Sequence, residues 1–133
     1  MNLLVICHGR MAEGLVDAMR LIIGEQEGVG TVALQETDSI DELAGRVQAA
    51  IKDLDRGDGV LILVDLMGAS PFNISARLAM ENDRIEVVTG ANLPMLLESA
   101  MQREGTSLRG LASIAKNAGI EAIVTLSEKM QSD

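Results

Sequence analysis

The strongest constraint on the fold is the regular alternation of short apolar segments with longer segments of helical spacing. Four compact apolar runs have strand character, at residues 3–7, 29–34, 60–64 and 85–89. Strands that alternate with helices need crossover connections, and such connections produce a parallel sheet with helices on both faces. The sequence therefore predicts an α/β fold with a doubly wound, mainly parallel sheet, for which we expect the strand order 2-1-3-4.

Capping residues and glycines mark the expected helix boundaries. Five helices are expected, beginning near residues 11, 39, 70, 93 and 107. Ser39 and Glu42 form a capping box at the second helix. Ser70 is expected to cap the third helix, with Pro71 at its first position. Gly119 is expected to end the fifth.

The last apolar run, residues 120–126, is β-branched and no helical segment follows it. Because no later helix covers this run, we expect a strand at an edge of the sheet, antiparallel or paired with another chain. A polar tail follows at residues 127–133, and no linker or repeat interrupts the sequence. A single domain over residues 1–133 is therefore predicted.

Charge and residue scarcity argue against several kinds of function. The 133 residues contain 11 Lys and Arg against 20 Asp and Glu, a formal net charge of −9, and Phe72 is the only aromatic residue. Nucleic acids and anionic membranes both favour a basic surface, so neither is an expected partner. One cysteine, Cys7, and one histidine, His8, offer no zinc-binding pattern. Without a leader or a membrane span in the sequence, a reducing, cytoplasmic setting is predicted.

Polar residues at the strand ends predict where chemistry takes place, since ligands of open parallel sheets bind beyond the carboxyl ends of the strands. His8 closes the first strand and Asp65 follows the third, and these strands are neighbours in the order 2-1-3-4. A carboxylate that holds one imidazole nitrogen leaves the other as a nucleophile. The alternative is a merely exposed or hydrogen-bonded His8 and an Asp65 that serves a turn.

The segment after Asp65 predicts an oxyanion site. Gly68, Ala69 and Ser70 form a turn of small residues that leads into the third helix. Backbone N–H groups and a hydroxyl at a helix N-terminus can bind phosphate oxygens, although plain N-capping by Ser70 accounts for the same residues. Neither a P-loop nor a dinucleotide-binding motif occurs, so nucleotide binding is not indicated.

Other chemistries fit these residues less well. A hydrolase triad of His8, Asp65 and Ser70 is disfavoured because Pro71 has no N–H for an oxyanion hole. Cys7 and His8 do not suit a dyad, since consecutive strand residues point to opposite faces. A receiver domain phosphorylated on Asp65 needs magnesium-binding acids where His8 stands. Phosphoryl transfer through histidine is the hypothesis that uses every strand end.

Three motifs are spread along the whole chain. They read His8-Gly9-x-x-Ala12-Glu13-Gly14-Leu15, Val64-Asp65-Leu66-x-Gly68-x-Ser70-Pro71-Phe72-Asn73 and Thr89-Gly90-Ala91-Asn92-Leu93-Pro94-Met95-Leu96. In this order and spacing they resemble the enzyme IIA domain of mannose-family sugar phosphotransferase systems.

The resemblance implies that His8 takes a phosphoryl group through Nε2 from the histidine-containing phosphocarrier protein. It then passes the group to a IIB subunit, which phosphorylates sugar entering through a IIC/IID membrane pair. Asp65 is expected to hold Nδ1, and the phosphate-binding residues are expected to be Gly9, Gly68, Ala69 and Ser70. The family uses no metal, nucleotide or other cofactor on this subunit, and it implies a homodimer that exchanges its last strand.

Two positions depart from the family pattern. Met67 stands where many members have an aromatic residue, and Ala69 where many have a second glycine. After Asp133 there is no linker of the kind that joins IIA to IIB in some members, so a free-standing IIA subunit is expected. The alternatives are the phosphotransfer subunit of a dihydroxyacetone kinase system and a non-catalytic regulatory module of the same fold.

Overall fold

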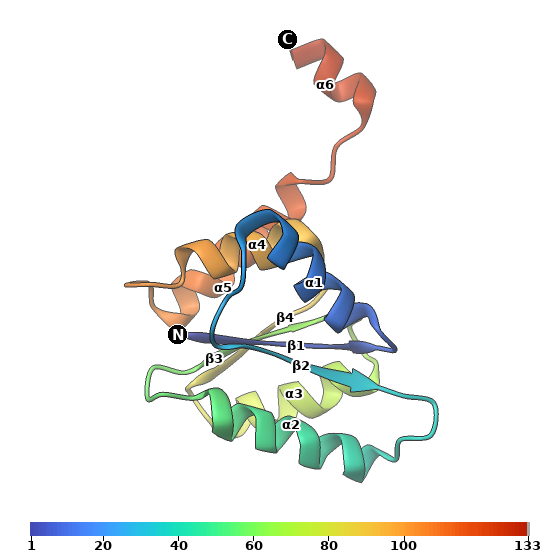
Figure 1. Ribbon diagram of the computed structural model, residues 1–133, viewed down its shortest axis with the longest axis vertical. Coiled ribbons are helices and arrows are strands. Elements are labelled where there is room, and N and C mark those ends of the chain that lie inside the picture. Colours follow the sequence, from blue (N-terminus) through green and yellow to red (C-terminus); the bar gives the residue numbers. More distant parts are fainter. Residues whose placement is uncertain (133) are drawn as a thin grey trace.

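The protein is described here from a computed structural model, which describes residues 1–132. Strands and helices alternate through β4 and are followed by two further helices and a short terminal one (Figure 1). In chain order the elements are β1 (Asn2–His8), α1 (Met11–Ile23), β2 (Val29–Leu34), α2 (Ile40–Leu54), β3 (Val60–Val64), α3 (Ser70–Glu81), β4 (Ile85–Val88), α4 (Leu93–Gln102), α5 (Leu108–Glu121) and α6 (Leu126–Ser132).

The sheet confirms the predicted order and direction. Its four strands are parallel and lie in the order β2-β1-β3-β4. Within β1, His8 is level with Leu34 of β2, and Ile6 is level with Val64 of β3. This register brings the carboxyl ends of β1 and β3 together at the centre of one sheet edge, which is where a doubly wound fold places its ligands.

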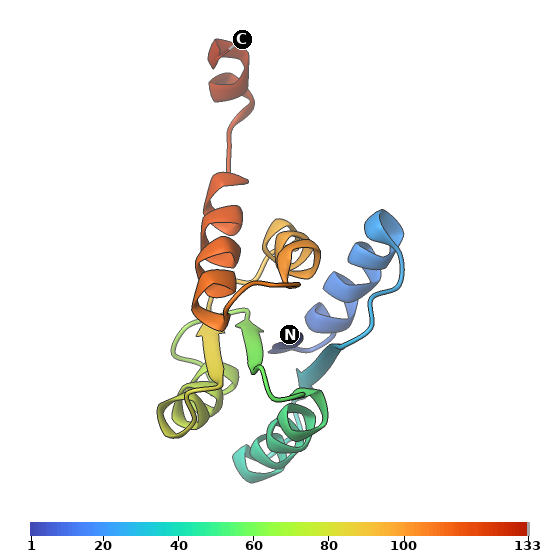
Figure 2. The same ribbon diagram turned by 90° about the vertical axis from the view of Figure 1, so that its left-hand side faces the viewer.

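Helices cover both faces of the sheet. Helices α1, α4 and α5 lie on one face and α2 and α3 on the other, so that the domain has three layers (Figure 2). Because the strands are buried from both sides, β3 has no exposed residue at all. Helices α1 and α4 therefore pack against a sheet face that is continuously apolar.

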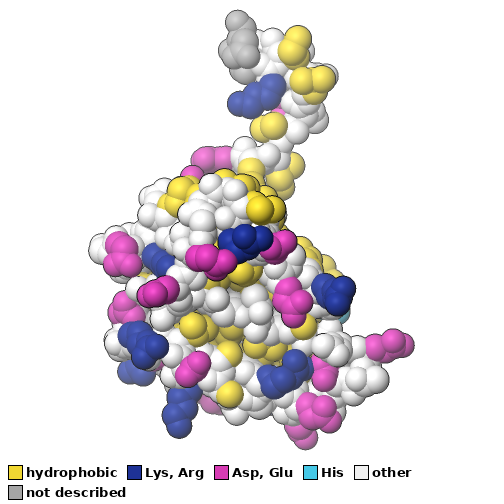
Figure 3. Space-filling view, viewed as in Figure 1, with side chains coloured by type: hydrophobic (Ala, Val, Ile, Leu, Met, Phe, Trp, Pro, Cys, Tyr) yellow, Lys and Arg dark blue, Asp and Glu magenta, His cyan; other side chains and the backbone are white. Residues whose placement is uncertain are grey.

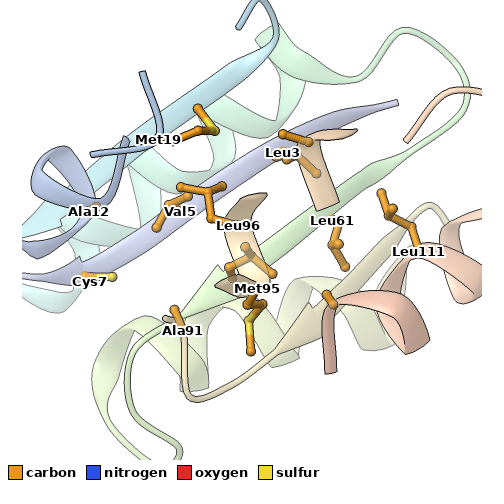
Figure 4. Packing of buried hydrophobic residues seen from close by; sticks show 13 residues of the cluster. Leu3, Val5, Cys7, Ala12, Met19, Leu61, Ala91, Met95, Leu96 and Leu111 are labelled. Carbon is orange, nitrogen blue, oxygen red and sulfur yellow. The ribbon is translucent and has the colours of Figure 1, made fainter. Parts of the chain in front are cut away.

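Alternation along β1 divides its side chains between two cores. Leu3, Val5 and Cys7 point into the core under α1, α4 and α5, where Met19 and Leu96 also lie (Figure 4). The residues between them face the opposite core, which is made by α2, α3 and the sheet. Its buried members are Leu4, Ile6, Val32, Leu43, Val47, Ile51, Val60, Ile62, Val64, Ile74 and Ile85. By the same period of two, His8 belongs to the α2 and α3 side.

Helix starts agree with the predicted caps except at α3. The Ser39 hydroxyl accepts from the Glu42 N–H at 3.1 Å, which is the expected half of the capping box. The prediction that Ser70 caps α3 is wrong: Ser70 is the first helical residue, Ala69 holds the capping position, and no side chain caps that end. Because the backbone of Ser70 is already helical, its hydroxyl is not engaged as a cap.

The last strand, predicted at residues 120–126, does not form within the single chain. Ile120 and Glu121 belong to α5, which continues through Gly119 because the Ala122 N–H still bonds to the Ala118 carbonyl. Residues 123–125 then lead away from the body, and most of the expected polar tail belongs to the short helix α6 (Figures 1 and 2). No neighbouring strand within the described residues pairs with this segment.

The projecting end is apolar as well as extended. Ile123 is 76% exposed, Val124 49% and Leu126 78%. Hydrophobic side chains are visible along this projection beside a basic one, and acidic and basic side chains are interspersed over the body of the same face (Figure 3). Exposed large apolar side chains on an extended segment mark a surface that is suited to a partner.

Candidate functional site

One carboxylate oxygen organises the end of β1. Asp65 Oδ2 accepts a hydrogen bond from the backbone N–H of His8 at 2.8 Å and lies 2.9 Å from Nδ1 of the His8 ring. The structure thus brings together the two residues that the strand-end argument paired. An imidazole that donates from Nδ1 carries its free lone pair on Nε2.

The register of the sheet explains this contact. Ile6 is level with Val64, so Asp65 comes level with Cys7, one residue before His8. At this point β3 ends and the chain bends, which lets the Asp65 carboxylate lie along the end of β1. The His8 side chain is 48% exposed and that of Asp65 only 11%. The Asp65 carboxylate therefore holds the His8 ring at Nδ1, while the rest of the ring stays accessible to an approaching molecule.

The carboxylate is held in its ionised form. Partial burial opposes ionisation of Asp65, but the hydrogen bonds from the His8 backbone and ring outweigh it, and the pKa of Asp65 is lowered. Its second oxygen, Oδ1, is buried and has no hydrogen-bond partner among the described residues. The charge is consequently directed at His8 through a single oxygen.

Cys7 takes no part in this site. Burial, and then the nearby Asp65 charge, raises the pKa of the Cys7 thiol to about 12. The side chain is fully buried in the core under α1 and α4 (Figure 4). A buried thiol of this kind is a small apolar core residue and not a nucleophile.

The small-residue loop follows Asp65 and enters α3. Gly68 has a φ of +86°, in the left-handed region that glycine adopts without strain. As the first residue of α3, Ser70 has a backbone N–H with no intrahelical acceptor, and so does Phe72. The helix N-terminus and these amides make the loop a place where negative charge is favoured.

The same arrangement of strands and loops occurs across a known family. The family model described as "EIIA-man: PTS system fructose IIA component" matches residues 2–116. The chain belongs to the enzyme IIA family of the mannose, fructose and sorbose phosphotransferase systems.

Curated relatives of this IIA chain differ in length. It is 36% identical over 123 residues to the mannose-specific EIIAB component of the phosphotransferase system of Escherichia coli (strain K12), covering 92% of this chain. The chain spans only 38% of the length of that relative. It is 28% identical over 130 residues to the fructose-specific EIIA component of Bacillus subtilis (strain 168), covering 98% of this chain and 89% of that one.

Solved structures share the fold of the IIA chain closely. The phosphotransferase system component EIIA from Streptococcus agalactiae superposes with a TM-score of 0.88 at 28% identity, covering 96% of this chain and 98% of that one. The mannose/sorbose-specific IIA subunit from Enterococcus faecalis superposes with a TM-score of 0.86 at 27% identity, covering 94% and 93%.

Gly9, one of the expected phosphate-binding residues, directly follows His8. Its backbone N–H donates to the Leu34 carbonyl of β2 at 2.8 Å. With a φ of +55°, Gly9 turns the chain sharply from β1 into α1.

A groove of about 810 Å³ runs beside β4, at the edge of the sheet. Among the residues that line it are Met67 after β3, Phe72 of α3, Glu86 of β4, and Arg109 and Lys116 of α5. Strand β4 pairs only with β3, so its outer edge is open. The groove therefore joins the loop after β3 to the unpaired edge of β4.

Asn73 is the residue at this site to which the sequence argument assigned no role. It lies on the first turn of α3 and bonds back to the loop through both its side chain and its backbone. A polar residue three positions after Ser70 could have suggested such a bond, but its partner depends on the path of the loop.

The described residues contain neither a cluster of metal ligands nor a membrane-spanning helix. Within residues 1–132, no cluster of three or more histidine, cysteine, aspartate or glutamate side chains is arranged to hold a metal ion. The helices of this part of the chain are also too short or too polar to cross a membrane.

Proposed function

We propose that this IIA chain is a phosphoryl carrier that acts through Nε2 of His8. The observation that carries the proposal is the 2.9 Å contact between His8 Nδ1 and Asp65 Oδ2, together with the half-exposed ring. This contact fixes the tautomer that has its nucleophilic lone pair on Nε2. The proposed donor is a phosphohistidine of the histidine-containing phosphocarrier protein.

The transfer balances without a further reactant. Nε2 of His8 forms a bond to phosphorus as the P–N bond of the donor histidine breaks, and the donor keeps the electron pair of that bond. The Nδ1 proton of His8 stays in place, and the Asp65 carboxylate offsets the positive charge that the ring gains. Reversal of these bond changes passes the phosphoryl group to the next acceptor.

The loop before α3 is proposed to bind the phosphoryl oxygens. The Ser70 hydroxyl, which does not cap the helix, and the backbone of Gly68, Ala69 and Ser70 are the groups assigned to this role. Phosphoryl transfer depends mainly on positioning and on stabilising spread-out negative charge. Helix and amide dipoles supply that stabilisation here, so we assign no metal or nucleotide cofactor to the step.

The proposed acceptor is a IIB subunit. Such a subunit would in turn phosphorylate a sugar entering through IIC and IID membrane subunits, so the sugar itself never contacts this chain. The fructose-specific and sorbose-specific relatives of similar length support a free-standing IIA component. A cytoplasmic location and a single functional domain over residues 1–133 are parts of the same proposal.

We also propose a homodimer that exchanges the segment after α5. The support is the open edge of β4, the groove beside it, and the extended segment that carries exposed Ile123 and Val124. An edge strand offers unpaired N–H and C=O groups to a strand from another chain. On that edge the Glu86 carboxylate now accepts from the Val87 N–H at 2.8 Å, and a pairing strand would take its place.

Two alternative functions can be distinguished from the proposed one by experiment. A phosphotransfer subunit of a dihydroxyacetone kinase system would pass its phosphate to a nucleotide bound in another subunit. A regulatory module would keep the fold without the transfer. The fold alone does not separate them, since a sigma-54 interaction domain protein from Enterococcus faecalis superposes with a TM-score of 0.73 at only 18% identity.

The deciding experiment incubates the protein with labelled phosphoenolpyruvate, enzyme I and the phosphocarrier protein. We expect an acid-labile phosphate on the wild type and none on His8→Ala. His8→Asn is the matched variant, because its amide can still contact Asp65 while lacking Nε2. Label on either variant, or none on the wild type, would refute the proposal. Chase of the label to a IIB subunit distinguishes a sugar phosphotransferase component from a dihydroxyacetone kinase component.

A further inference from the structure

Asn73 holds two consecutive peptide groups of the phosphate loop. Its side-chain Nδ2 donates to the Gly68 carbonyl at 3.2 Å, and its backbone N–H donates to the Ala69 carbonyl at 2.9 Å. Both acceptors precede Ser70 directly. The bond to Ala69 is the first main-chain hydrogen bond of α3, and the bond to Gly68 is the one that depends on the Asn73 side chain.

Because the peptide bond is planar, these two hydrogen bonds also set the directions of the Ala69 and Ser70 N–H groups. In a trans peptide the carbonyl of one residue and the N–H of the next point in opposite directions. Because the Gly68 and Ala69 carbonyls both point to Asn73, the N–H groups of Ala69 and Ser70 both point away from it. Two successive amides that face the same way form an anion-binding concavity.

The first of these peptides needs an outside restraint. Gly68 has a φ of +86°, and apart from its chain neighbours no heavy atom of the described residues lies within 4 Å of where its Cβ would be. Glycine leaves the adjoining peptide free to rotate, because it has no Cβ that restricts the backbone. The Asn73 amide is the side chain that bonds to the Gly68 carbonyl.

We propose that Asn73 is a positioning residue for phosphoryl transfer, whose side-chain amide sets the Gly68–Ala69 peptide so that the Ala69 and Ser70 amides face the phosphoryl oxygens. The inference rests on the proposed role of His8 as the phosphoryl acceptor. Asn73 itself makes no bond to phosphorus and moves no proton. It acts through the loop, by keeping two donors aligned as charge spreads over the transferring group.

A purely structural brace is the competing explanation. Asn73 is exposed in the first turn of α3, and in this explanation its side chain only stabilises the folded loop. The two explanations differ in what they alter. If Asn73 is only structural, its substitution lowers the thermal midpoint of unfolding. If Asn73 is a positioning residue, its substitution changes the rate of transfer and the response of the loop amides to phosphate.

The test compares Asn73→Ala, Asn73→Asp and Asn73→Gln with the matched control Asn117→Ala. Asn117 is an exposed residue of α5 whose side chain makes no hydrogen bond among the described residues. Steady-state phosphorylation of His8 is measured against the concentration of the phosphocarrier protein. We expect Asn73→Ala to lower kcat roughly threefold to tenfold, the rate equivalent of one ordinary hydrogen bond, with KM for the phosphocarrier protein unchanged.

We also expect the three Asn73 variants to differ in their rates of transfer. Asn73→Asp keeps the shape but cannot donate to the Gly68 carbonyl, so it should be at least as slow as Asn73→Ala. Asn73→Gln keeps the donor on a longer arm and should recover part of the rate. Asn117→Ala should behave as wild type in every measurement.

A spectroscopic readout separates positioning from stability. In ¹H–¹⁵N spectra, phosphorylation of the wild type should shift the Ala69 and Ser70 amide protons downfield. Asn73→Ala should reduce the Ala69 shift, because it removes the side-chain bond to the Gly68 carbonyl and keeps the backbone bond to the Ala69 carbonyl. Equal rates and equal shifts in wild type and Asn73→Ala would overturn the inference even if His8 is phosphorylated as proposed. Absence of phosphate on wild-type His8 would instead refute the proposed function.

Discussion

A single carboxylate oxygen of Asp65 contacts both the backbone N–H and the ring of His8. Asp65 Oδ2 lies 2.8 Å from the His8 backbone nitrogen and 2.9 Å from Nδ1. The backbone contact fixes where the strand ends, and the ring contact fixes how the imidazole is turned. Rotation of the ring away from this carboxylate would therefore break one contact while the other still holds the chain in place.

Substitution of Asp65 should separate these two effects. Asp65→Asn keeps an oxygen for the backbone N–H but removes the charge that offsets the phosphorylated ring. We expect phosphorylation of His8 to slow by about 10- to 100-fold, since a hydrogen bond to a charged group is worth about 1.5–3 kcal/mol. The measurement is the single-turnover rate from the phosphorylated phosphocarrier protein.

Circular dichroism and the thermal midpoint serve as the control for Asp65→Asn. The Asp65 side chain is only 11% exposed, so a small loss of stability is expected, with the fold retained. An unfolded variant would mean that Asp65 is primarily a structural residue. A folded variant with an undiminished rate would mean that the carboxylate does not assist transfer.

Ser70 and Ser39 form a natural pair for testing which serine caps a helix. The Ser39 hydroxyl accepts from the Glu42 N–H, whereas no side chain caps α3. Ser39→Ala should therefore cost about 1 kcal/mol of unfolding free energy and leave transfer unchanged. Ser70→Ala should change stability by less than about 0.5 kcal/mol and slow phosphorylation of His8.

Urea titration and the transfer assay measure the two variants side by side. The expected result is a crossed pattern, with stability lost in one serine variant and rate lost in the other. If Ser70→Ala loses as much stability as Ser39→Ala and no rate, the hydroxyl has only a local structural role.

The sheet was predictable from the sequence because its strands are apolar on both sides. The run at residues 60–64 has no polar residue to disturb it, and β3 spans the same residues in the structure. The pairing of His8 with Asp65 followed from strand order alone, since both residues end neighbouring strands. Periodicity and topology thus suffice wherever burial is complete.

The C-terminal segment was not predictable in the same way. Residues 120–126 have strand propensity, but Ile120 and Glu121 continue α5 because the backbone bonds of the helix remain available to them. A strand also needs a neighbour, which the sequence of one chain does not identify. The Asn73 contact escaped prediction for a related reason, because the position of the Gly68 carbonyl depends on the loop conformation.

A carboxylate far from the site should give the protein an acid-sensitive stability. Asp55 Oδ1 accepts from the Gly57 N–H at 2.8 Å and the Gly59 N–H at 3.2 Å, and Oδ2 pairs with Arg84 at 2.8 Å. The Gly57 amide contributes most to the lowered pKa of Asp55, and Arg84 and Gly59 add to it against partial desolvation. These contacts join the end of α2 to the segments that flank β3 and β4.

The sign of the effect follows from the lowered pKa. The contribution of Asp55 is complete above its ordinary pKa of 3.8 and is lost as the pH falls through the lower folded value. Asp55→Asn, which is neutral throughout, should cost about 1–2 kcal/mol at pH 7 and progressively less below about pH 4.

Asp53→Asn is the matched control for this pH dependence. Asp53 is an exposed residue of α2 whose side chain makes no hydrogen bond or ion pair among the described residues. Urea unfolding at several pH values should show the Asp55→Asn deficit shrinking with acid and no deficit for Asp53→Asn. A deficit that stays constant from pH 7 to pH 3 would contradict the assignment of Asp55.

The exchanged dimer predicts that the segment after α5 controls oligomeric state. Ile123 is 76% exposed and Val124 49% exposed in the single chain, so neither stabilises the monomer by burial. Adjacent strand residues point to opposite faces, and at least one of the two should be buried in the β4 groove of the partner copy. Ile123→Asp and Val124→Asp are therefore tested separately.

A symmetric dimer buries the affected side chain twice, and this sets the size of the effect. Burial of one aliphatic side chain is worth about 1.5 kcal/mol, so loss of two should raise the dimer dissociation constant about 100-fold. Analytical ultracentrifugation measures this constant, with Met80→Asp as the control because Met80 is 87% exposed on α3 and outside the segment. Because these side chains are exposed in the single chain, the variants should remain folded as they dissociate. If both variants dimerise as tightly as Met80→Asp, the segment is not exchanged and the β4 edge is covered in another way.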